Sequence, residues 1–183
     1  GTQLRPSFTR LLEPGAGYTG GEYFFEAKHL EGPTPPLIFV DLGESEKILE
    51  GSAKDAPDGL RRAIAFFLVA AAAQTLSDPE VVKAGQNFLC HTSQLKNQHR
   101  NLEKLIRHYV DRVGDDLEKG GGEAVTKLTS AYKELGLTMK HLPPFESIVA
   151  EIQKRLVARK IVVVNSDAVT DSGRGLNFVI GGN

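Results

Sequence analysis

Two short runs in the second half of the chain are apolar at consecutive positions, and they strongly limit the folds open to it. Residues 161–164 are Ile-Val-Val-Val, and residues 178–180 are Phe-Val-Ile. A strand with apolar side chains on both of its faces needs cover on both, which is typical of parallel sheets in α/β proteins. Asn87–Thr92 is a third strand-like run. We therefore expect strands over residues 87–92, 160–165 and 177–181.

Helical periodicity fills the intervals between these strands. The apolar spacing predicts helices over about residues 93–113, 123–135 and 143–157, and it places Val157 on the buried side of the last one. Ser93 is the expected N-cap of the first helix, and Gly136 is the expected left-handed C-cap of the second. Strands that alternate with helices predict an α/β fold with an open, mostly parallel sheet and helices on both faces.

Residues 86–183 form this predicted α/β unit, and residues 1–85 form a predicted N-terminal extension. The extension begins with a loop rich in proline, glycine and aromatic residues. A strand over Leu37–Leu42 and an Ala-rich helix with Pro57 in its first turn are expected to follow. The apolar run Ala63–Ala73 in that helix is shorter than the ~20 residues that span a bilayer, so we expect a core helix.

Composition excludes several classes of protein. Lys and Arg total 22 against 23 for Asp and Glu, so the net charge of −1 gives no general attraction to nucleic acid. A single cysteine excludes a disulfide framework. We expect a cytoplasmic protein with no membrane partner. The absence of an initiating Met, and an end at Asn183 directly after a strand, suggest a fragment whose α/β unit is truncated at its C-terminus.

Ligands of open α/β sheets bind beyond the carboxyl ends of the strands, and this rule selects three places in the chain. At the first, a strand leads into a helix N-terminus, where main-chain N–H groups and the helix dipole favour a phosphate. The alternative is that Thr92 and Ser93 only cap the helix. The candidate nucleic-acid-binding residues are His91, Thr92, Ser93, Gln94, Lys96 and Arg100.

The other two places are polar or glycine-rich strand ends, for which an ordinary turn is the alternative. They form a predicted edge coupled to nucleotide binding. Its residues are Asn165, Ser166 and Asp167 after one strand, and Gly181, Gly182 and Asn183 after the other. No histidine pair has the spacing that places both rings on one helical face, and no metal ligand is assigned.

Two further classes of function remain open from the residues alone. A metal-dependent endonuclease needs clustered carboxylates, and Asp41 with Glu44, Glu46 and Lys47 is the nearest approach to such a cluster. A protein-interaction module would instead leave Tyr18, Tyr23 or Phe24 exposed as a patch.

Several segments appear in the order expected of one known family. They are Tyr18–Phe25, Leu60–Ala73, Phe88–Ser93, Val162–Asp167 and Phe178–Asn183. Over nearly its whole length the chain resembles the Z1 domain of proteins described as endonucleases.

This resemblance implies a part of a bacterial DNA-processing ATPase that acts in restriction or defence beside restriction-modification components. Residues 86–183 would then be most of a second RecA-like helicase lobe, with His91–Ser93 at the nucleic-acid backbone. ATP and magnesium are expected cofactors of the full-length protein, bound with its remaining ATPase domains. The chain contains no Gly-x-x-x-x-Gly-Lys-Ser/Thr loop, so no ATP hydrolysis is expected from this piece alone, and its catalytic residues are unassigned.

Overall fold

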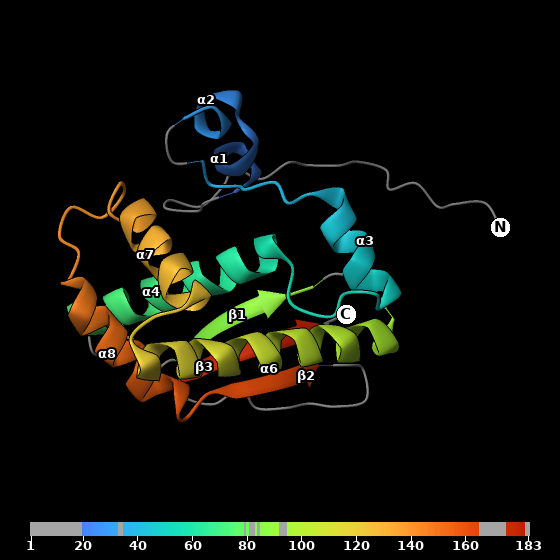
Figure 1. Cartoon of the computed structure of the whole chain (residues 1–183). Helices are drawn as coiled ribbons and strands as arrows, with labels where there is room; N and C mark the ends of the chain where they lie inside the picture. The colour runs from blue at the N-terminus through green and yellow to red at the C-terminus, as the bar shows by residue number, and fades with distance from the viewer. Residues whose placement is uncertain are drawn as a thin grey trace. The chain divides into compact units, whose positions relative to one another are not determined.

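The computed structural model describes two compact units, residues 1–39 and residues 40–183, which are treated separately below. The described residues are 20–32, 35–78, 80, 83, 85–91, 95–164 and 175–181, without the side chains of residues 22, 27 and 29. Figure 1 shows the labels of the helices and strands.

The described residues of the first unit form two short helices, α1 (Gly21–Phe25) and α2 (Ala27–Leu30). The rings of Tyr23 and Phe24 meet edge to face, with 5.4 Å between their centroids. After Pro35 and Pro36 the chain is irregular up to residue 41, so the predicted strand over Leu37–Leu42 is wrong. Its apolar side chains satisfy a strand pattern, but no described strand pairs with them.

Helix α3 (Leu42–Glu50) begins where that strand was expected to end. The Asp41 carboxylate accepts a hydrogen bond of 2.8 Å from the Gly43 N–H and caps the helix. Gly51, at φ 72°, ends it in the left-handed conformation that glycine adopts without a steric cost. Asp41 is therefore a helix cap and does not stand at the end of a strand.

In the part of the chain that the structure describes, the sheet consists of three parallel strands: β1 (Gln86–Cys90), β2 (Lys160–Val164) and β3 (Leu176–Gly181). Their order is β1-β3-β2, so the last strand of the chain lies in the middle. The register places Phe88 opposite Phe178 and Phe178 opposite Ile161. All three predicted strands and their parallel arrangement are confirmed, with small shifts of the ends.

Helices α6 (Lys96–Lys119), α7 (Glu123–Leu135) and α8 (Phe145–Leu156) connect β1 to β2. The predicted bounds of α7 are confirmed. Helix α6 begins after Leu95 and not at a Ser93 cap, and it passes Gly114 to end at the left-handed Gly120. Gly136 has a right-handed conformation, so its predicted role as a left-handed cap is wrong.

Helix α4 (Asp58–Ser77) begins later than the sequence predicted. Pro57 is its N-cap and does not lie in its first turn. The Glu44 carboxylate, from α3, accepts a hydrogen bond of 2.8 Å from the Gly59 N–H and so holds α3 to the start of α4. By length and composition α4 could cross a membrane, but nine of its residues are buried, so it serves here as a core helix.

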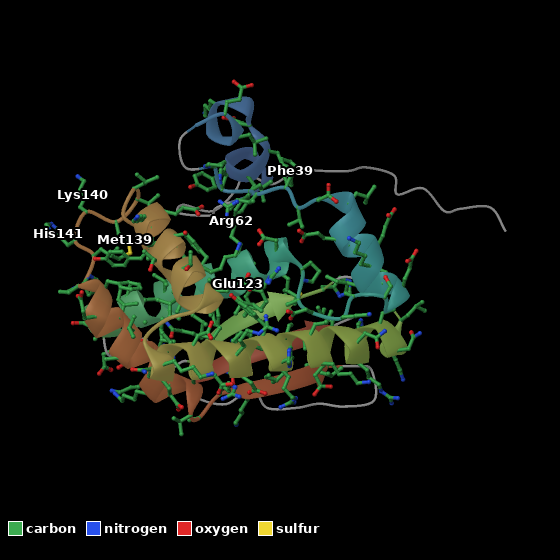
Figure 2. The ribbon with its side chains drawn as sticks, viewed as in Figure 1. Phe39, Arg62, Glu123, Met139, Lys140 and His141 are labelled. Carbon is green, nitrogen blue, oxygen red and sulfur yellow. The ribbon has the colours of Figure 1, made fainter. Side chains whose placement is uncertain are left out.

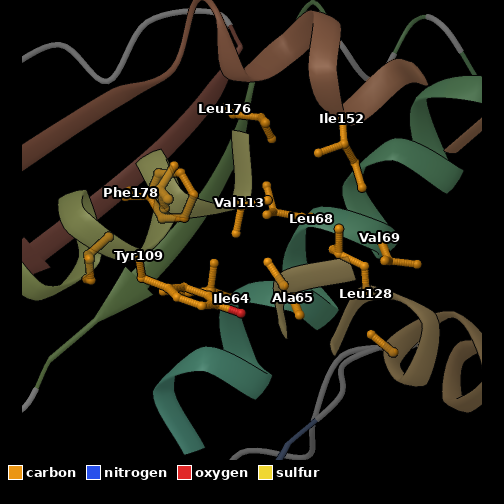
Figure 3. Packing of buried hydrophobic residues seen from close by; sticks show 14 of the residues in the cluster. Ile64, Ala65, Leu68, Val69, Tyr109, Val113, Leu128, Ile152, Leu176 and Phe178 are labelled. Atoms are coloured by element: carbon orange, nitrogen blue, oxygen red, sulfur yellow. The ribbon is translucent and has the colours of Figure 1, made fainter. Parts of the chain in front are cut away.

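The core lies between the helices and one face of the sheet (Figure 3). Phe178 on β3 packs against Phe67 of α4, with 5.6 Å between their ring centroids. Phe88 and Ile161, which flank Phe178 on the neighbouring strands, also contact the core. Leu89 on the other face is 68% exposed. The predicted helices on both faces are therefore not found among the described residues, in which α4 and α6 contact the same face of the sheet.

Helix α4, assigned from sequence to the extension, shares this core with the elements after residue 86. The division of the chain at residues 85 and 86 remains a prediction.

A buried arginine joins the start of β1 to two helices. Arg155 on α8 donates hydrogen bonds to the Thr75 hydroxyl (2.9 Å) and to the Gln86 side-chain carbonyl. Gln86 in turn donates to the Gln74 side-chain carbonyl at 2.7 Å. Burial lowers the pKa of Arg155 below its usual range. This cluster anchors the amino edge of the sheet to α4 and α8.

Ion pairs join α4, α6 and α7 at the surface. Arg61 binds both carboxylate oxygens of Glu123, at 2.7 and 2.9 Å, and Arg112 binds Asp55 at 2.7 Å. Lys127 pairs with Asp58. A further pair joins Arg62 to Glu134 at 3.1 Å (Figure 2 labels Arg62 and Glu123).

Leu68 and Val157 give a matched test of the core. Leu68 is buried, so Leu68→Ala is expected to lower the free energy of unfolding by about 2–5 kcal/mol. Val157, which the sequence placed inside, is 86% exposed, so Val157→Ala should change it by no more than about 0.5 kcal/mol. Urea denaturation measures both, and equal losses would contradict this packing.

The ion pairs predict a dependence of stability on pH. Burial acts to raise the pKa of Asp55, but the hydrogen bonds from Arg112 and the Ala56 N–H outweigh it, and the net pKa is lowered from 3.8. The hydrogen bond from Lys127 lowers the pKa of Asp58. The pairs therefore stabilise the fold above about pH 4, and this contribution is lost as the pH falls through the lowered values.

Unfolding by urea should show a smaller loss of stability between about pH 6 and pH 3 in Asp55→Asn/Asp58→Asn than in the unchanged chain. The exposed Asp115→Asn is the control and should keep the full loss. An identical pH profile for all three proteins would contradict the assignment.

Candidate nucleic-acid interface

The carboxyl ends of the three strands lie at one edge of the sheet. Cys90 and Val163 both lie opposite Ile180, and Val164 lies opposite Gly181. His91 follows β1 directly and is exposed. The structure thus aligns the starting points of the three segments that the sequence analysis selected.

His99, in the first turns of α6, is packed against the end of β3. Its side chain is 96% buried, and a Cβ atom on Gly181 would lie 2.9 Å from its Nδ1. The ring of His91 lies across from it, with 6.4 Å between the two centroids. Helix α6 therefore begins directly beside the ends of β1 and β3.

The start of α6 favours an anionic ligand. Its N-cap is Leu95, which has no side-chain acceptor, and its first turn contains no acidic residue. Lys96 and Arg100 are exposed in its first two turns. The partial positive charge of the helix N-terminus and these two cations act in the same direction.

Four of the twelve predicted site residues can be placed, and the structure brings all four to this edge. They are His91, Lys96, Arg100 and Gly181. The other eight lie outside the described residues: Thr92, Ser93, Gln94, Asn165, Ser166, Asp167, Gly182 and Asn183. The roles of all twelve residues in nucleic-acid contact and nucleotide coupling stay predictions.

Two cations of the same helix were not selected from the sequence. Lys104 and Arg107 are exposed and continue the line that begins with Lys96 and Arg100. The sequence could have shown them, because positions 96, 100, 104 and 107 are spaced by four, four and three residues, which keeps their side chains on one helical face.

Two of the carboxylates proposed for a nuclease site accept hydrogen bonds from main-chain N–H groups. The Asp41 side chain caps α3, and the Glu44 side chain holds the start of α4. Among the described residues, no three His, Cys, Asp or Glu side chains lie close enough together to hold a metal ion. In this part of the chain the arrangement that a metal-dependent nuclease needs is not found.

Exposed rings in the first unit bear on the interaction-module alternative. Tyr23 is 47% exposed and Phe25 is 69% exposed, whereas Phe24 is half-buried. Tyr18 lies outside the described residues. Two aromatic side chains of this unit are thus exposed.

A cavity of about 450 Å³ lies away from the candidate interface. Its lining includes Gln74 and Asp78, at the end of α4, and Met139, in the loop after α7 (Figure 2). Because Gln74 hydrogen-bonds Gln86 at the start of β1, this cavity lies toward the amino edge of the sheet.

A family model for the Z1 domain matches residues 59–183, which includes α4, all three strands and the helices between them. The chain belongs to the Z1 domain family. The comparisons with curated proteins and with solved structures found no match. The Z1 match includes the carboxyl edge of the sheet and the whole of α6, so the candidate interface lies within the Z1 domain.

Gly181 gives a test of how closely α6 and the sheet meet at this edge. Its φ is +93°, and an added Cβ would lie 2.5 Å from the Val164 carbonyl oxygen. Gly181→Ala is therefore expected to lower the free energy of unfolding by roughly 2–4 kcal/mol, through backbone strain and overpacking.

Gly121→Ala is the control, because an added Cβ there meets nothing within 4 Å. It should change stability by no more than about 0.5 kcal/mol. Thermal or urea unfolding measures both variants, and a Gly181→Ala protein as stable as the control would contradict the close approach.

Proposed function

We propose that this Z1 domain contacts the phosphate backbone of nucleic acid as part of a larger DNA-processing ATPase. The observation that carries the proposal is the position of the α6 N-terminus, with Lys96 and Arg100, beside the carboxyl ends of three parallel strands. Open α/β sheets bind their ligands at this edge, and helix N-termini favour phosphate.

The expected binding is local and depends strongly on salt. The chain has a net charge of −1, so its whole surface does not attract a polyanion. Cations gathered at one edge still release counterions from the backbone that they contact, which makes affinity fall as salt rises.

Under this proposal the domain does not complete a catalytic cycle by itself. ATP and magnesium act in the remaining ATPase domains of the full-length protein, and closure of those domains moves the strand ends along the backbone. Endonuclease activity and a place among restriction-modification components belong to the same proposal, and they rest on what the family resemblance implies.

A protein-interaction module is the second candidate, and the exposed rings of Tyr23 and Phe25 favour it. It is compatible with nucleic-acid contact, because these rings belong to the first unit and the candidate interface belongs to the second.

The test removes the two cations at the start of α6. In Lys96→Gln/Arg100→Gln, affinity for a fluorescein-labelled oligothymidylate is expected to fall at least about tenfold at low salt, measured by fluorescence anisotropy. The control, Lys133→Gln/Lys140→Gln, removes two exposed cations on α7 and its following loop (Figure 2 labels Lys140) and should leave affinity unchanged.

The full-length protein gives the second arm. DNA-stimulated ATP turnover is expected to be lost in Thr92→Ala/Ser93→Ala. Equal affinity of both cation variants, or nicking of plasmid by this chain alone that Asp41→Ala abolishes, would overturn the proposal.

A further inference from the structure

A line of four cations runs along the exposed side of α6, away from the sheet edge. Lys96, Arg100, Lys104 and Arg107 are all exposed, and their spacing places them within one side of the helix. The buried residues of α6, among them Leu102, Tyr109 and Val113, lie on the other side. We call these four residues the α6 track.

The dimensions of the α6 track suit a linear polyanion. Successive cations that are four residues apart are separated by about 6 Å along the axis, and the whole track is about 16 Å long. The first distance is comparable to the separation of successive phosphates along an extended nucleic-acid strand.

Internal ion pairs leave at least two of these four charges available to a ligand. Arg107 pairs with Glu103 at 2.8 Å, and Glu103 is the one carboxylate among residues 96–107. Among the described residues, Arg100 and Lys104 have no ion pair. The next residue on this side, Asp111, pairs with Arg159 and marks the end of the track.

Helix stability does not explain the arrangement. A helix is stabilised by acidic residues in its first turn, but α6 has none there and begins with a lysine. The basic half of α6 is the half that starts at the sheet edge. A ligand outside the chain accounts for this placement better than the helix itself does.

We propose that single-stranded nucleic acid lies along the α6 track, with about one backbone phosphate for each turn of the helix. This inference rests on the proposed function and extends its site from the sheet edge by two further turns. The track is narrow, because its four residues lie within one side of the helix. It therefore follows one backbone, whereas an anionic membrane surface would favour a broad basic face bordered by apolar side chains.

The test uses this chain and Lys104→Gln/Arg107→Gln, which lies outside the sheet edge. Glutamine preserves helix propensity, and circular dichroism confirms the fold. Affinity for fluorescein-labelled oligothymidylate is measured by anisotropy between about 30 and 300 mM salt. Loss of two phosphate contacts is expected to reduce the slope of log affinity against log salt by about 1.4. The control Lys133→Gln/Lys140→Gln should keep the original slope.

Each outcome has a separate meaning. If Lys96→Gln/Arg100→Gln weakens binding and Lys104→Gln/Arg107→Gln leaves the slope unchanged, the α6 track is wrong and the proposed function stands. If the unchanged chain binds no oligothymidylate at about 30 mM salt, the proposed function and the α6 track are both wrong. Tighter binding to the matched duplex overturns the single-strand assignment. Binding to phosphatidylglycerol vesicles that is equally sensitive to the Lys104→Gln/Arg107→Gln variant overturns the choice of nucleic acid.

Discussion

The insertion of β3 between β1 and β2 is the interaction on which the rest of this Z1 domain depends. Phe178 at the centre of β3 is fully buried, between Phe88 and Ile161 in the neighbouring strands. The pairing of β1 with β3 joins Gln86 to Leu176, ninety residues apart. Bringing residues so far apart in the chain together costs conformational entropy. The pairing of the strands is therefore stable only when the helices between them pack as well.

The same pairing creates the candidate interface. Parallel strands in this register end together, so Cys90, Val164 and Gly181 lie within about one residue of a common line. Helix α6 follows β1 closely and must begin at that line. His99 then packs against Gly181, and the cations of the α6 track extend outward from it. At the opposite edge, Arg155 binds the first residue of β1. One edge is thus closed by buried hydrogen bonds, and the other presents cations.

Local sequence predicted the regular elements well where one pattern dominated. The bounds of α7 and the position of β2 followed from apolar spacing and from β-branched residues. Prediction failed where one pattern fits two structures: the apolar run Leu37–Leu42 looks like a strand, but Asp41 caps a helix inside it. Gly114, Gly120 and Gly136 look alike in the sequence, and only Gly120 ends its helix in the left-handed conformation. Of the candidate interface, Lys96 and Arg100 were selected from the sequence, whereas Lys104 and Arg107 were not.

The sequence by itself predicted an α/β protein with parallel strands, because β-branched runs and helical periodicity are local signals that do not depend on distant contacts. The Z1 family was indicated separately, by the resemblance of several segments that occur in the family's order. Tertiary structure alone decided the strand order, the single helical face of the described sheet, and the pairing of Arg61 with Glu123 across 62 residues. These depend on which distant surfaces bury the most apolar area together, and no local pattern contains that information.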